Sequence, residues 1–134
     1  MRLMPTLDEA DVEKIVKACK AATKEKGRRA TIAIVDQAGH LLYLERPEVN
    51  GVNTSDMAFM KARTAALRGR PSSNFAQRVK ESPGSLTAPN YLGVDGGVPV
   101  FHEQECIGGV GVSGIDHDDE PIAAVGASLF PKKK

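Results

Sequence analysis

Residues 106–114 read Cys-Ile-Gly-Gly-Val-Gly-Val-Ser-Gly, an apolar run interrupted repeatedly by glycine. A second apolar run, residues 98–101, precedes it, and the polar residues 102–105 separate the two. Two such runs joined by a short polar segment predict a β-hairpin. The glycines leave space beside the second strand, which either a helix or a ligand can fill.

A stripe of small side chains follows one face of the helix predicted over residues 56–67. Ala58, Ala62 and Ala65 share this face, and Gly69 marks the end of the helix. Small residues allow such a helix to pack closely on a sheet or on a partner. The composition agrees with this pattern, because the chain has 13 glycines but no tryptophan, two tyrosines and four phenylalanines.

Another hairpin is predicted over residues 31–44. Two aliphatic runs, residues 31–35 and 41–44, flank residues 36–40, where Gly39 can take a positive φ. Both faces of these strands are apolar. We therefore expect both strands in the centre of a sheet that is covered on both sides.

Two further helices are predicted near the ends of the chain. Residues 6–9, Thr-Leu-Asp-Glu, fit a capping box that starts with Thr6, and apolar residues recur at helical spacing as far as Cys19. In the last helix, Ile122, Val125 and Leu129 are expected to face inward. Hairpins with helices between them favour a mainly antiparallel sheet with helical layers.

Length and charge exclude several classes of protein. The chain has 134 residues, which is typical of one domain, and its 18 Lys+Arg against 17 Asp+Glu give a net charge of +1. A nucleic-acid-binding protein normally has a clear basic excess. Two cysteines cannot form the disulfide framework of a small secreted protein, and no secretory signal or membrane-spanning stretch is visible. We therefore expect one domain, residues 1–134, in a cytoplasmic protein with reduced thiols and no nucleic-acid or membrane partner.

Four segments carry more specific patterns. Residues 34–41 read Ile-Val-Asp-Gln-Ala-Gly-His-Leu, and residues 55–65 read Ser-Asp-Met-Ala-Phe-Met-Lys-Ala-Arg-Thr-Ala. Residues 96–100 read Gly-Gly-Val-Pro-Val and precede the glycine-rich residues 107–114. In this order, the segments resemble the GlcG/HbpS-like family, which includes the C-terminal domain of PduO. Residues 46–52 depart from the family's usual Arg-Met-Asp-Gly-Ala, so the loop there is reshaped.

This resemblance implies a fold of the α/β (α+β) class, a profilin-like domain. An antiparallel sheet of about five strands would be flanked by helices in α-β-α layers. It also implies a homo-oligomer, a tetramer or octamer. Family members are associated with haem binding, haem degradation or iron sensing, with cobalamin handling, and with small-molecule catabolic pathways. The first prediction is therefore an oligomeric small-molecule-binding protein whose ligand is haem or another tetrapyrrole. The alternative is a small catabolic-pathway enzyme that acts on a small carboxylate.

Histidine is the residue type that most directly bears on a haem ligand, because haem needs an axial donor beside an apolar slot. The chain has three histidines, His40, His102 and His117, and all are predicted in turns or loops. A loop histidine is normally an exposed ring. With the resemblance added, His40 or His102 becomes the candidate axial ligand.

Lys61 is the candidate catalytic residue of the alternative prediction. Its neighbours on the predicted helix include Met57 and Ala58, which are apolar or small. Desolvation on such a face lowers the pKa of a lysine and suits it as acid, base or anion anchor. A structural role is equally consistent, with Lys61 paired to Asp36 or to an acid of residues 116–120.

A pocket for a small carboxylate could combine Arg46, Lys61 and Arg63, with a hydroxyl from Ser113. The candidate ligand-binding residues are therefore Asp36, His40, Arg46, Lys61, Arg63, His102 and Ser113. The acidic residues 116–120 are expected to cap the last helix rather than to bind a metal, because their spacing fits no closed zinc pattern.

Overall fold

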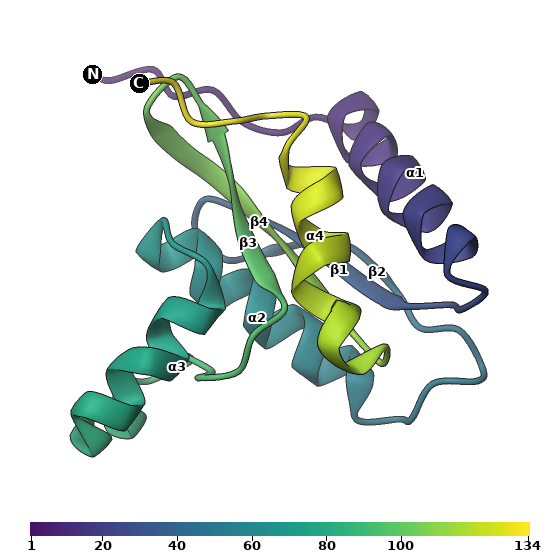
Figure 1. Cartoon of the computed structure of the whole chain (residues 1–134). Coiled ribbons are helices and arrows are strands. Elements are labelled where there is room, and N and C mark those ends of the chain that lie inside the picture. Colours follow the sequence, from purple (N-terminus) through teal and green to yellow (C-terminus); the bar gives the residue numbers. More distant parts are fainter.

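Four antiparallel strands and four α-helices form the domain (Figure 1). The computed structural model describes residues 1–134. The elements are α1 (Glu9–Glu25), β1 (Thr31–Asp36), β2 (Leu41–Glu45), α2 (Thr54–Arg68), α3 (Ser72–Glu81), β3 (Gly97–His102), β4 (Glu105–Ser113) and α4 (Asp119–Ala127). Short 3-10 turns lie at Pro83–Thr87 and Asp116–Asp118. The strand order is β2-β1-β4-β3, and all neighbouring strands are antiparallel.

Helices cover both faces of this sheet. α1 and α4 lie beside each other on one face, and α2 covers the other face with α3 next to it (Figure 1). The predicted antiparallel sheet flanked by helices is thus confirmed. It has four strands instead of about five, because the Pro- and Gly-rich connection between α3 and β3 forms a 3-10 turn and a loop. None of the helices combines the length and the apolar character needed to cross a membrane.

The two faces of the sheet differ in side-chain size. On β1, Ile32 faces α1 and α4, whereas Ala33 faces α2. On β4, Gly109 and Gly111 lie under α2, and a Cβ atom at Gly111 would overlap the Ala58 carbonyl oxygen. The space that the glycines leave is therefore filled by a helix and not by a ligand. The alanine stripe of α2 is the surface that fills it.

α1 begins two residues later than its predicted cap. Asp8 and Asp11 form the capping box in place of Thr6: the Asp11 amide donates to Asp8 Oδ1 at 2.8 Å, and the Asp8 amide donates to Asp11 Oδ2 at 3.0 Å. The reciprocal pair satisfies two amides at once, which a threonine three residues from a glutamate would also do. Further along α1, Cys19 is fully buried, and burial raises the pKa of its thiol to about 12. Cys19 is therefore a core residue, as a free cysteine usually is.

Two expectations about burial are wrong at the edges of the domain. Ile122 of α4 is buried, but Val125 and Leu129 are exposed, because α4 ends at Ala127 and only one side of it packs on α1 and the sheet. β1 has the expected central position, whereas β2 is an edge strand. Leu44 of β2 is correspondingly exposed.

Candidate functional site

A surface groove runs between α1 and β2. Three hollows of about 340, 310 and 610 Å³ follow one another along it. Lys20 lines the first and second hollows, and Tyr43 lines the second and third. The three hollows are therefore one feature, which we call the α1–β2 groove. It remains open because β2 is an edge strand, so no further strand follows it on that side.

The groove has apolar walls and opposite charges at its two ends. Val12 and Val16 of α1 and Tyr43 of β2 line its middle. The end near the start of α1 carries Asp8, Glu9 and Glu13. The other end, which we call the cationic end, is lined by Lys20, Lys24, Arg28 and Arg29 and by one carboxylate, that of Glu45. Acids at the start of a helix and bases at its end complement the helix dipole, so the sequence of α1 itself makes the groove polar along its length.

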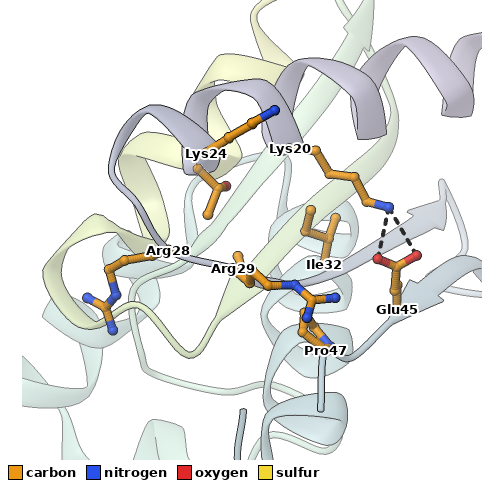
Figure 2. Close-up of a pocket in the computed structure, with 9 residues that line it drawn as sticks. Lys20, Lys24, Arg28, Arg29, Ile32, Glu45 and Pro47 are labelled. Carbon is orange, nitrogen blue, oxygen red and sulfur yellow. Dashed lines mark hydrogen bonds and ion pairs between the residues drawn. The ribbon is translucent and has the colours of Figure 1, made fainter. Parts of the chain in front are cut away.

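Three side chains form a hydrogen-bonded group where the hollows meet. Lys20 and Glu45 point toward each other across the cationic end (Figure 2), with Lys20 Nζ 2.8 Å from Glu45 Oε1. The Tyr43 hydroxyl donates to Glu45 Oε2 at 2.9 Å. The hydrogen bonds from Lys20 and Tyr43 lower the pKa of Glu45, and the bond to Glu45 raises the pKa of Lys20. Burial, followed by the bond to Glu45, raises the pKa of Tyr43. At neutral pH the group is therefore an ammonium, a carboxylate and a neutral phenol.

Not every cation at this end is matched by an acid. Arg28 pairs with Asp116 at 3.6 Å and donates to main-chain carbonyl groups, and Figure 2 shows it directed away from the other residues. The Arg29 guanidinium lies beside Pro47 (Figure 2) and forms no salt bridge, and neither does Lys24. The cationic end thus presents two positive side chains that are free to bind an anion.

Lys61 lies elsewhere, in the interior. It is 2% exposed, and its Nζ donates to the Val112 carbonyl and to Asp119 Oδ2, both at 3.1 Å. Asp119, at the start of α4, also accepts from the Ile115 amide at 3.0 Å. Burial raises the pKa of Asp119 against the lowering effects of Ile115 and Lys61. The pairing with an acid of residues 116–120 is one of the two partners expected for Lys61, and it joins α2 to α4.

The other members of the expected carboxylate pocket do not meet Lys61. Arg63 reaches the β1–β2 turn, where its Nη1 donates to the Gly39 carbonyl at 3.4 Å. Arg46 is exposed and donates to the Asn50 carbonyl at 3.0 Å. Ser113 is buried at the end of β4, where its register partner is Thr31 on β1. Their separation follows from their positions on different ends and faces of the sheet.

The candidate haem ligands lie in turns, as expected. Asp36 Oδ1 accepts from the amides of Ala38 and His40 at 2.9 Å, so this carboxylate shapes the β1–β2 turn. The His40 side chain is 76% exposed and lies 3.8 Å from Asp36 Oδ2. His102 is exposed at the end of β3. Neither histidine lines the α1–β2 groove.

The acidic residues before α4 have separate partners. Asp116 pairs with Arg28, Asp118 pairs with Lys26 at 3.4 Å, and Asp119 points inward to Lys61. Asp118 is the N-cap residue, but its side chain makes no capping hydrogen bond. The capping role expected for this run is therefore limited to favourable charge at the helix start.

Sequence reasoning missed the groove. Tyr43 looks like an ordinary strand residue, and Lys24 looks like a base that complements the end of a helix dipole. The available signal is the density of cations from Lys20 to Arg29, where Glu25 is the one acid. A cluster of this kind indicates an anion site only once a facing strand is known.

Comparison with known proteins gives consistent relatives. Residues 7–128 match a family described as "Haem degrading protein HbpS-like". The chain is 32% identical over 114 residues to Protein GlcG of Escherichia coli (strain K12), covering 84% of this chain and 85% of that protein. A crystal structure of a double mutant of HbpS from Streptomyces reticuli has a TM-score of 0.90 at 29% identity, covering 98% of this chain and 91% of that chain. The crystal structure of a PduOC:Heme complex has the same fold, with a TM-score of 0.86 at 20% identity, covering 97% of this chain and 100% of that chain.

Proposed function

Because the chain belongs to the HbpS-like family, we propose that it binds a small amphipathic anion in the α1–β2 groove, with haem or another tetrapyrrole as the first candidate. The observation that supports this most directly is the combination of apolar walls with unmatched cations at one end. A tetrapyrrole with carboxylate side chains has the same polarity, a flat apolar ring with an acidic edge. Ligand sites in proteins are typically apolar clefts with a few polar groups that fix orientation.

The alternative, an enzyme in which Lys61 acts as acid, base or anion anchor, has weaker support. The Lys61 ammonium is buried and already donates to a carbonyl and a carboxylate. It lines none of the hollows of the groove. The relatives carry haem in their names or titles, and none of those names includes a carboxylate substrate.

Haemin titration tests the proposed site. We expect the purified protein to shift the Soret band of haemin, and the double variant Lys24→Ala/Arg29→Ala to weaken binding by about tenfold or more, because each charge-assisted hydrogen bond contributes roughly 1.5–3 kcal/mol. The measurement is the dissociation constant from the absorbance change.

The matched control is Arg78→Ala/Lys80→Ala on α3, which removes the same two charges from exposed positions on a different helix. It should bind haemin as the wild type does. Equal weakening by both double variants would mean that the protein's net charge, and not the groove, attracts the ligand. No Soret shift with wild-type protein would count against the proposed function itself.

Self-association is the second part of the proposal. The outer edge of β2 has no partner strand, and Leu41, Leu42 and Leu44 on it are exposed. An exposed apolar edge strand is a template for pairing with another chain, and natural proteins normally protect it. We propose that a second copy of this chain covers the β2 edge.

Light scattering during size-exclusion chromatography measures this directly. We expect a particle mass that is a multiple of 14.3 kDa, and a smaller multiple for Leu44→Lys, because a charge at a buried edge contact is unfavourable. Leu86→Lys is the matched control, since Leu86 is also exposed but lies in the Pro83–Thr87 turn. A wild-type monomer would contradict the proposal.

A further inference from the structure

The α1–β2 groove fits the body of a haem better than it fits the iron. Its walls are apolar and its cationic end suits carboxylates, but axial iron ligands in haem proteins are His, Cys, Met or Tyr. The three hollows are lined by no histidine, cysteine or methionine. His40, His102 and His117 are all exposed on turns outside the groove.

Tyr43 is the one axial ligand type on the groove, and it is already engaged. Its hydroxyl proton goes to Glu45 Oε2, whose carboxylate also accepts from Lys20 Nζ. A bond to iron requires the phenolate, whereas burial and the bond to Glu45 raise the pKa of this phenol. The Lys20 amine is equally unsuitable, because a salt-bridged ammonium has no free lone pair.

The cations beside this group are free. Lys24 and Arg29 form no salt bridge, and the Arg29 guanidinium lies at the edge of the groove beside Pro47 (Figure 2). An arginine fork binds a carboxylate through two parallel hydrogen bonds. Recognition at this site is therefore carried by the acidic edge and the ring of the ligand.

We infer that the α1–β2 groove selects a carboxylate-bearing tetrapyrrole by its apolar ring and its acidic groups, without a bond from a side chain of this chain to a metal. The inference rests on the proposed function and makes it more specific. The ligand class then includes metal-free porphyrins as well as haem.

Parallel titrations with haemin and with metal-free protoporphyrin IX test the inference. The first is followed by Soret absorbance and the second by porphyrin fluorescence. We expect dissociation constants for the two that agree within about threefold, since a metal bond absent from both complexes contributes to neither. Lys24→Ala/Arg29→Ala should weaken both by the same factor, about tenfold. Tyr43→Phe, His40→Ala and His102→Ala should leave the Soret position of bound haemin unchanged.

The outcomes separate the two levels of the proposal. Haemin that binds at least about thirtyfold tighter than metal-free protoporphyrin would overturn the inference and leave the proposed function standing. A Soret band that moves in Tyr43→Phe or in either histidine variant would do the same and would identify the axial ligand. Failure of both compounds to bind would overturn the proposed function as well.

Discussion

Replacing Gly111 with alanine is expected to lower the free energy of unfolding by roughly 4 kcal/mol or more. The added methyl carbon would overlap the Ala58 carbonyl oxygen and come within 2.7 Å of the Ala62 amide nitrogen. Both are main-chain atoms of α2, which cannot rotate away as a side chain can. Since domains of this kind are stable by about 5–15 kcal/mol, the variant should melt far below the wild type when followed by circular dichroism.

Gly84→Ala is the matched control for this substitution. It adds the same methyl group in the Pro83–Thr87 turn, where no atom lies within 4 Å of the new position. Its effect should stay within about 0.5 kcal/mol. Similar melting temperatures for the two variants would show that α2 does not rest on the backbone of β4.

Lys61→Met is expected to destabilise the domain by about 3–5 kcal/mol, because it leaves a buried carboxylate without its cation. The side chain of Asp119 is 10% exposed, so water cannot replace the lost ammonium. Chemical denaturation at neutral pH gives the measurement. Lys61→Met/Asp119→Asn should regain most of the loss, since the amide still accepts from Ile115 and no buried charge remains.

The pH dependence of the single variant gives an independent check. Burial already raises the pKa of Asp119 above its ordinary 3.8, and removal of Lys61 raises it further. A carboxyl with a raised pKa binds protons more readily in the folded state, so its destabilising effect is present above the raised pKa and disappears as the pH falls toward the unfolded value. The difference in stability between wild type and Lys61→Met should therefore shrink below neutral pH. A constant difference from pH 7 to about pH 4 would contradict the assigned ion pair.

Much of the fold could be predicted because its signals are local. The glycines of residues 108–111 and the alanines of residues 58–65 each have the spacing of their own element, and the two patterns are complementary. Sequence left open whether a helix or a ligand fills the space beside the strand, because both need small neighbours. The first cap was misplaced because Thr6 and Asp8 are both good cap residues with an acid three positions later.

The groove could not be predicted because its two walls come from elements that pair only in three dimensions. Lys20 and Tyr43 are 23 positions apart, and nothing in either local pattern brings them together. The same holds for Lys61 and Asp119, which are 58 positions apart. Sequence narrowed the partner of Lys61 to two places, and the packing of α4 against the sheet decides between them.

The contact between α2 and the glycines of β4 has a consequence for how the domain can change. On that face, backbone lies against backbone, so a larger residue at Gly109 or Gly111 has no side chain to displace. On the opposite face, the side chains of Lys20 and Tyr43 border open space and can take other rotamers. One face is thus closed to substitution, whereas the other can acquire a new ligand preference while the scaffold stays intact.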